Sequence, residues 1–95
     1  MILSETEIQN ELKDLPDWTY KDDKISREME FPSFPELMRF VNGLAEYFEE
    51  TQHHADMHIY YTKITFELQT FDEGSKVTEK DIATAKEVDR RAKSL

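Results

Sequence analysis

Three short motifs of one kind divide this chain and limit how it can fold. Ser4-x-x-Glu7, Ser33-x-x-Glu36 and Thr78-x-x-Asp81 each place a hydroxyl residue three positions before a carboxylate. This spacing is typical of a capping box, in which both side chains accept backbone N–H groups at the start of a helix. The sequence therefore predicts three helices, over residues 5–13, over residues 34–51 and from residue 78 onward.

The middle helix has the clearest hydrophobic pattern in the chain. Its apolar residues follow the i, i+3, i+4, i+7 spacing of an amphipathic helix: Phe34, Leu37, Met38, Val41, Leu44, Ala45 and Phe48. Phe40 and Tyr47 lie outside this stripe. Either the buried face of the helix is wide, or a second face packs on a partner, and the pattern leaves both possibilities open.

The segment between the first two helices reads as a β-hairpin. Residues 18–20 begin with Trp18 and are rich in strand-forming types, while residues 25–31 alternate between apolar and polar side chains. Arg27 is the one charged residue on the apolar side of this alternation. The polar stretch at 21–24 is predicted to be the turn that joins the two strands.

A second hairpin is predicted between the middle helix and the last one. Apolar residues stand at odd positions up to residue 61 and at even positions from residue 64. A single strand cannot change parity without a turn or a bulge. We therefore expect strands over 57–61 and 64–71 with a tight turn at Thr62-Lys63, followed by a loop over 72–75.

The resulting order of elements is α-β-β-α-β-β-α. Tight turns make the strands of each hairpin antiparallel, and amphipathic helices must cover an apolar face of the sheet. The fold class is therefore predicted to be α+β, with a four-stranded antiparallel sheet covered on one face by helices. Ninety-five residues suffice for one domain with one modest core, so residues 1–95 are expected to form a single domain.

The composition excludes several classes of function. The formal net charge of −9 argues against nucleic acid and against anionic membrane surfaces as partners. No stretch approaches the 18 apolar residues of a membrane-spanning helix, and no secretory leader is visible. The chain has no cysteine, which excludes disulfides and thiolate chemistry and is compatible with the cytoplasm, where we expect the protein to reside.

All three histidines of the chain fall within six residues, at 53, 54 and 58. Histidine can donate and accept protons near neutral pH, so His53 and His54, with Glu49 one helical turn upstream, could form an acid–base site. The pair could equally cap the C-terminus of the middle helix, where cations are favoured. His58 fits a strand surface, and adjacent ligands such as His54, Asp56 and His58 lack a credible zinc spacing.

The histidine pair belongs to a longer series of residues with fixed spacings. In this chain the series reads Glu49, His53-His54-Ala55-Asp56, Tyr61, Thr70-Phe71-Asp72, Gly74-Ser75 and Val77-Thr78-Glu79-Lys80-Asp81. With Trp18 after a short helix, it resembles the pterin-4a-carbinolamine dehydratase family over nearly the whole chain. Two positions depart from the family pattern: Ala55 stands where a proline is usual, and Phe71 stands where a third histidine is usual.

The resemblance implies an enzyme that removes water from 4a-hydroxytetrahydropterin to give quinonoid dihydropterin, without a metal or other cofactor. It implies catalytic roles for His53, His54 and Glu49. It implies a pterin-binding role for four further residues: Trp18, Thr70, Phe71 and Asp72. Family members form dimers and tetramers, so a homodimer or homotetramer is expected.

The substitution at position 71 leaves more than one function open. Phenylalanine cannot titrate or hydrogen-bond, so the resemblance implies a dehydratase with weakened activity. One alternative is a non-catalytic family member that acts as a pterin- or protein-binding module. Another is a pterin-related enzyme with an altered substrate, because an exchanged residue at Phe71 would change the pocket.

Overall fold

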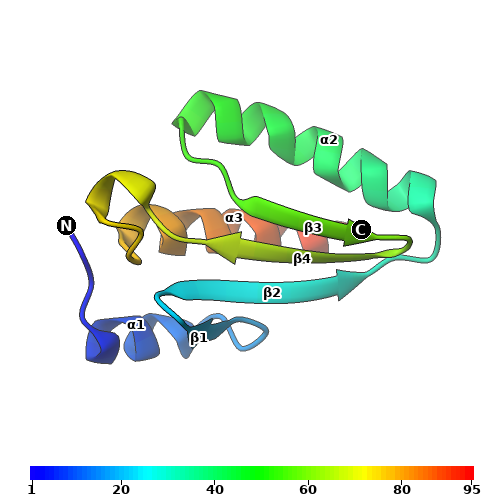
Figure 1. The fold of residues 1–95 in the computed structure, drawn as a ribbon. Coiled ribbons are helices and arrows are strands. Elements are labelled where there is room, and N and C mark those ends of the chain that lie inside the picture. Colours follow the sequence, from blue (N-terminus) through cyan, green and yellow to red (C-terminus); the bar gives the residue numbers. More distant parts are fainter.

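The computed structural model describes all 95 residues and shows three helices on a four-stranded sheet (Figure 1). The order is the predicted α-β-β-α-β-β-α, with a short 3₁₀ turn, η1, added before the last helix. The elements are α1 (Glu5–Leu12), β1 (Thr19–Lys21), β2 (Lys24–Glu30), α2 (Phe34–Thr51), β3 (Asp56–Tyr60), β4 (Lys63–Leu68), η1 (Phe71–Glu73) and α3 (Glu79–Lys93). No helix combines the length and the apolar character needed to cross a membrane.

All neighbouring strands are antiparallel, in the spatial order β1-β2-β4-β3. The first hairpin turns at Asp22 and Asp23, which both have positive φ, as a two-residue turn of type I′ requires. The second turns at Tyr61 and Thr62, one residue earlier than predicted, with Tyr61 at φ 60°. The change of parity correctly indicated that a turn is present. Because the local residues are poor turn formers, its position was predicted one residue too late.

The end of β4 also differs from the expectation. The strand was predicted to continue to residue 71, but it ends at Leu68, and Phe71–Glu73 form η1. The chain leaves the turn through Gly74, whose φ of 74° suits glycine. This early end of the strand places Thr70 and Phe71 beside the C-terminal end of α2, where the site described below is built.

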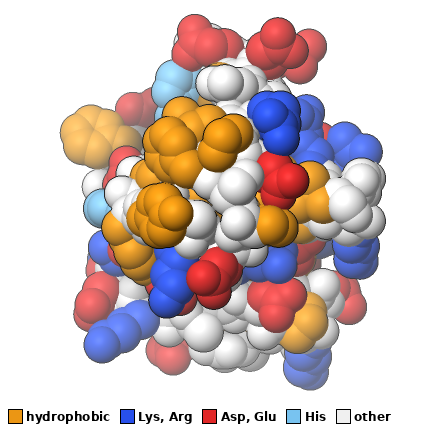
Figure 2. All heavy atoms as spheres, turned by 90° about the vertical axis from the view of Figure 1, so that its right-hand side faces the viewer, with side chains coloured by type: hydrophobic (Ala, Val, Ile, Leu, Met, Phe, Trp, Pro, Cys, Tyr) orange, Lys and Arg blue, Asp and Glu red, His pale blue; other side chains and the backbone are white.

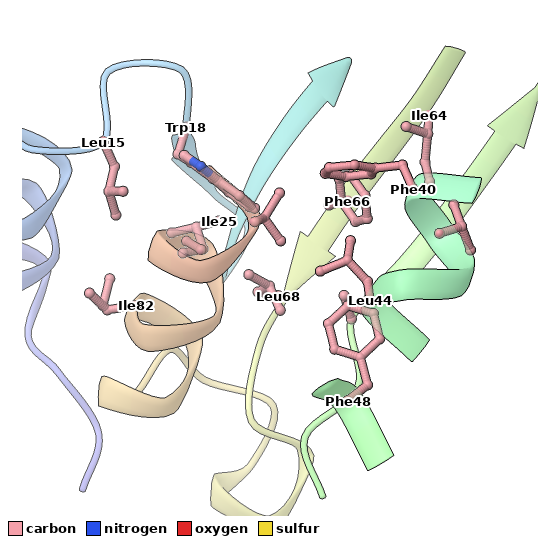
Figure 3. Close-up of a cluster of buried hydrophobic side chains, with 14 of the residues drawn as sticks. Leu15, Trp18, Ile25, Phe40, Leu44, Phe48, Ile64, Phe66, Leu68 and Ile82 are labelled. Carbon is pink, nitrogen blue, oxygen red and sulfur yellow. The ribbon is translucent and has the colours of Figure 1, made fainter. Parts of the chain in front are cut away.

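The sheet has one apolar and one polar face. Register pairs Ile25 with Leu68 and Met29 with Ile64 on the apolar face, while Ser26 and Glu67 are paired on the other. Side chains from all three helices join the apolar face in one core, part of which is shown in Figure 3. Full burial of each large side chain contributes roughly 1.5–3 kcal/mol. The prediction that helices cover one face of the sheet is confirmed.

The helix starts form largely as predicted. At α1 and α3 both halves of the capping box are present, and Ser4 and Thr78 are the N-cap residues. At α2 the Ser33 hydroxyl accepts the N–H of Glu36, but the Ser33 N–H does not donate to the Glu36 carboxylate in return. Capping is a local interaction within four residues, so the sequence alone defines these starts well.

The two aromatic residues outside the stripe of α2 pack within the chain. Phe40 is buried against Phe31 and Phe66, with ring centroids 5.3 and 6.3 Å away. Tyr47 is half-buried beneath Arg91, whose guanidinium carbon lies 5.6 Å from the ring centroid. The buried stripe of α2 therefore includes Phe40, whereas Phe34 and Ala45 of the predicted stripe are exposed.

Arg27, the charged residue on the apolar side of β2, is part of a half-buried polar cluster. Its Nη1 donates to Asp89 Oδ1 at 2.6 Å, and Nη2 lies 3.5 Å from Asp17. The same Asp89 oxygen accepts the indole N–H of Trp18 at 2.8 Å. The side chains of Arg27 and Asp89 are only 16% and 15% exposed, so the cluster fixes α3 on β2.

Replacing Asp89 with Ala should lower the free energy of unfolding by about 3 kcal/mol, because it leaves the Arg27 charge and the Trp18 N–H buried without their partner. Urea denaturation measures the loss. Asp14→Ala, an exposed change at the same end of the molecule, should cost less than about 0.5 kcal/mol. Adding Arg27→Met to Asp89→Ala should recover part of the loss, and equal costs for Asp89→Ala and Asp14→Ala would contradict this account.

Glu87 on α3 holds two arginines. Its carboxylate accepts from Arg90 at 2.6 Å and from Arg91 at 2.7 Å. These hydrogen bonds lower the pKa of Glu87 from 4.5 to about 2. Arg91 in turn donates to the Gly43 carbonyl at 2.8 Å, so Glu87 helps to hold α3 against α2.

Because the pKa of Glu87 is lower in the folded state, its contribution is complete above about 4.5 and is lost as the pH falls toward about 2. Glu87→Gln should therefore cost roughly 1 kcal/mol at neutral pH. The difference from the native chain should shrink steadily below pH 4.5. Denaturation series at several pH values check this, and a difference independent of pH would show that the ion pairs contribute little.

Candidate active site

Three segments distant in sequence meet at one end of the molecule. They are the C-terminal end of α2, the stretch after β4 that includes η1, and the first turn of α3, which lie together at the left of Figure 1. They enclose a cleft of about 260 Å³. Its lining is mostly polar: Gln52, His53, His54, Gln69, Thr70, Phe71, Asp72 and Lys80.

The end of α2 turns the two histidines in different directions. Gln52 adopts a left-handed conformation with φ 55°, and the N–H of His53 bonds back to the Phe48 carbonyl at 3.2 Å. This is the usual way for a helix to end, although glycine is the preferred residue there. The reversal buries the His53 side chain to 10% exposure and leaves that of His54 58% exposed.

His53 belongs to a buried hydrogen-bond network around Asp81. Its Nε2 lies 2.5 Å from Asp81 Oδ1, and the other carboxylate oxygen accepts the Thr70 hydroxyl and the Thr78 N–H, both at 2.9 Å. The Thr70 and Thr78 hydroxyls lie 2.7 Å apart. Every member is buried, so the network fixes the position of the His53 ring.

His54 forms an exposed pair with Glu49. The distance between His54 Nε2 and Glu49 Oε2 is 2.8 Å, and the Glu49 side chain is 70% exposed. Such a pair is screened by solvent and contributes little to stability. It nevertheless places a second imidazole and a carboxylate at the mouth of the same cleft.

The loop after β4 supplies the opposite wall. Phe71 is 84% exposed, which is unusual for a large aromatic residue and leaves its ring face available to a ligand. Asp72 follows it along the same wall. Thr70 lines the cleft too, but its hydroxyl already donates to Asp81.

Contacts to the first hairpin brace this wall. The Gln69 amide donates to the carbonyls of Asp23 and Ser75, and Lys76 pairs with Asp23 at 2.7 Å. The hydrogen bond from Lys76 lowers the pKa of Asp23, and the same bond raises the pKa of Lys76. The turn of the first hairpin thus holds the loop that carries Phe71.

The structure brings together most of the residues predicted for the site. His53, His54, Thr70, Phe71 and Asp72 line the cleft, and Glu49 reaches its edge through His54. Asp81 was expected only as a capping residue, and its contact with His53 was not predicted. The signal was present in the fixed spacing, but the contact with His53 spans 28 positions and is set by the fold.

Trp18 and His58 lie elsewhere. Trp18 is buried among the core residues beside Asp89 and does not reach the cleft. His58 lies on β3, exposed on the polar face of the sheet as predicted, with Nε2 3.1 Å from Glu67. Desolvation by burial raises the pKa of Glu67, but the hydrogen bonds that it accepts from His58 and Lys24 outweigh this effect and lower the pKa.

A larger cleft of about 460 Å³ lies near the start of α2, lined by Phe31, Pro32, Glu36, Arg39, Phe40 and Leu95. Size alone would favour it as a ligand site. It contains no imidazole and no paired titratable groups, whereas the smaller cleft has two imidazoles that are each paired with a carboxylate, His53 with Asp81 and His54 with Glu49. The chemistry therefore points to the smaller cleft.

An α+β domain with a buried Asp–His pair and an exposed Glu–His pair around one cleft is equipped for proton transfer to and from a small ligand. The model of the family described as pterin 4 alpha carbinolamine dehydratase matches residues 1–91. This chain belongs to that family of hydro-lyases, and the resemblance inferred from the sequence is confirmed.

Several relatives are similar over nearly their full length. A protein of Picosynechococcus sp. is 43% identical over 83 residues, covering 87% of this chain and 89% of its own length. One of Sulfolobus acidocaldarius is 36% identical over 90 residues, covering 95% and 98%. Both are provisionally named pterin-4-alpha-carbinolamine dehydratase. A crystal structure from Brucella melitensis, titled transcriptional coactivator/pterin dehydratase, has a TM-score of 0.89 and 29% identity, covering 95% of this chain and 97% of that one.

Proposed function

We propose that this protein dehydrates 4a-hydroxytetrahydropterin to quinonoid dihydropterin in the recycling of a pterin cofactor. The observation that carries the proposal is the buried contact between His53 and Asp81 at the edge of a cleft. Family membership and the names of the relatives supply the substrate class. The residue roles that follow are part of the proposal.

The reaction needs one acid and one base. The bond between C4a and the hydroxyl oxygen breaks, the oxygen gains a proton and leaves as water, and a ring nitrogen loses a proton as the new double bond forms. No electrons are exchanged with another molecule. Each positioned proton-transfer group can contribute roughly 10²–10⁴-fold, which suits a site built on imidazoles.

His53 is the best-positioned of the two imidazoles. The Asp81 carboxylate accepts from three sides, so Nε2 of His53 is a donor in this contact. Nδ1 is then the nitrogen left to take a proton from the substrate or, once protonated, to give one. In this proposal Asp81 is a positioning residue, because it fixes the tautomer and orientation of His53.

The remaining residues have complementary roles. His54, oriented by Glu49, supplies the second proton-transfer group from the solvent side of the cleft. The exposed ring of Phe71 offers a face on which a flat pterin can stack, and Asp72 offers a carboxylate to ring N–H groups. Thr70 acts through Asp81, and Trp18 has no part in the proposed site.

Phe71 is the basis for proposing a reduced rate. Where the resemblance implies a third histidine, the chain has a side chain that cannot transfer protons. The other proton-transfer groups are retained, so activity should be lowered and not abolished. The exposed position of Phe71 supports this, since a histidine there would face the cleft without disturbing the core.

The activity prediction concerns His53, Asp81 and Phe71. On 4a-hydroxytetrahydropterin, the native chain should exceed the uncatalysed rate. His53→Ala should lower kcat roughly 10²-fold or more by removing a proton-transfer group, and Phe71→His should raise it. Asp81→Asn should lower kcat roughly 10-fold and change its pH profile, because the amide can present an N–H to Nε2 and favour the wrong tautomer. Stopped-flow absorbance follows the product.

The matched control is His58→Ala, an imidazole removed from the far face of the sheet, which should leave the rate unchanged. Unfolding curves show whether each variant is folded. A native rate equal to background, with pterin binding retained, would overturn the dehydratase proposal. If Phe71→His alone then gained activity, the chain would be a binding module in a catalytic fold.

A binding role is the second candidate function. The exposed Phe71 at the mouth of the cleft favours it, and the Brucella melitensis relative carries a double name that includes transcriptional coactivator. In this alternative the chain binds a pterin or a protein without turnover. The activity series separates the two candidates, because only the first predicts a loss on His53→Ala.

We also propose that the protein is a homodimer or homotetramer of the cytoplasm. The lack of cysteine is compatible with a reducing compartment.

Support for self-association comes from β3, an unpaired sheet edge on which Ile59 and Tyr60 are 39% and 49% exposed. Apolar side chains gather at the adjoining end of the molecule (Figure 2). Antiparallel pairing of two β3 strands about His58 would place Met57 opposite Ile59.

Light scattering should therefore show a dimer or a larger assembly for the native chain. Ile59→Lys should shift it to monomer, because a charge at the strand edge opposes edge-to-edge pairing. Ile2→Lys, a similarly exposed apolar residue at 48%, should not. A native monomer in dilute solution would contradict self-association, and an assembly that survives Ile59→Lys would exclude the β3 edge as its interface.

A further inference from the structure

The lining of the cleft contains one lysine, Lys80, and no arginine. The segments that form the cleft are otherwise acidic and carry Glu49, Glu50, Asp72, Glu73 and Glu79. Despite these neighbours, no carboxylate lies within 4.0 Å of the Lys80 ammonium, whereas Lys86 on the same helix pairs with Glu11 at 3.6 Å. The Lys80 side chain is therefore available to a ligand.

Nothing in the fold explains a lysine at this position. Lys80 is the second residue of α3, where the helix dipole disfavours a cation. The residues three and four positions away on either side are Lys76, Val77, Ala83 and Thr84, so the helix offers it no ion pair. Only its backbone bonds are used, to Thr78 and Thr84.

Most other donors in the cleft are already engaged. Both amide N–H groups of Gln69 go to the carbonyls of Asp23 and Ser75, and one of the two of Gln52 goes to the Glu49 carbonyl. The Thr70 hydroxyl goes to Asp81. Apart from the imidazoles and the second N–H of Gln52, Lys80 is the side-chain donor left for a ligand, and Asp72 is the carboxylate in the lining.

This pair of groups complements one edge of a pterin ring. That edge presents a carbonyl oxygen at position 4, which accepts, beside an N–H at position 3 and an amino group at position 2, which donate. We propose that Lys80 hydrogen-bonds the 4-oxo group and makes the site select 4-oxo pterins over 4-amino pteridines. The inference rests on the proposed function and adds the residue that sets its ligand specificity.

The test compares two stable fluorescent probes that differ at position 4: pterin itself, and 2,4-diaminopteridine, which has a donor in place of the acceptor. Fluorescence titration of the native chain should show roughly tenfold tighter binding of pterin, because a charge-assisted bond is lost with the diamino probe. Lys80→Met should remove this preference, and Lys80→Glu should reverse it. Lys86→Met, on α3 outside the cleft, should leave it unchanged.

The outcomes separate this inference from the proposal beneath it. Equal binding of the two probes by the native chain, or an unchanged preference in Lys80→Met, overturns the role of Lys80 while leaving the pterin site in place. Failure of the native chain to bind either probe overturns the pterin site and the inference together. Loss of both probes in Lys80→Met, with an unaltered unfolding curve, would show a general contact that does not discriminate at position 4.

Discussion

One buried carboxylate connects the helices and the loop that form the cleft. Asp81 accepts hydrogen bonds from His53 after α2, from Thr70 after β4, and from Thr78 at the start of α3. A buried carboxylate is costly unless such donors surround it, so the segments can approach only if they supply those donors. The arrangement that satisfies Asp81 also presents His53 to the cleft. In this way, the helix cap and the orientation of the imidazole depend on the two oxygens of the same carboxylate.

The sequence predicted the features that depend on neighbouring residues. Helix starts at Ser4, Ser33 and Thr78 were correct because capping is decided within four positions, and α2 was correct from end to end because its hydrophobic period runs over five turns. The boundaries of β4 were less accurate. Residues after Leu68 continue an alternating pattern, but Thr70 forms only an isolated bridge with Lys76, and pairing is a property of the sheet and not of the segment.

Features that depend on distant contacts could not be predicted from the residues alone. Phe40 is in the core because Phe31 and Phe66 meet it there, and Trp18 is away from the cleft because Asp89, 71 positions later, accepts its N–H. Most of the residues that line the cleft were nominated from fixed spacings, which record such distant contacts indirectly. Asp81 shows the limit of that approach, since its spacing was noticed and its contact with His53 was not.

The two histidines illustrate how burial divides roles between identical side chains. His53 is held on several sides and is therefore suited to a defined direction of proton transfer, while His54 is exposed and can exchange protons with water. In the proposed dehydration one group gives a proton to the departing hydroxyl and another takes one from the ring nitrogen, and exchange with water through His54 can return both groups to their starting states. Phe71 is even more exposed than His54, but a phenylalanine ring cannot transfer protons. In the proposed site the retained pair covers both functions, so we expect the activity to be lowered and not abolished.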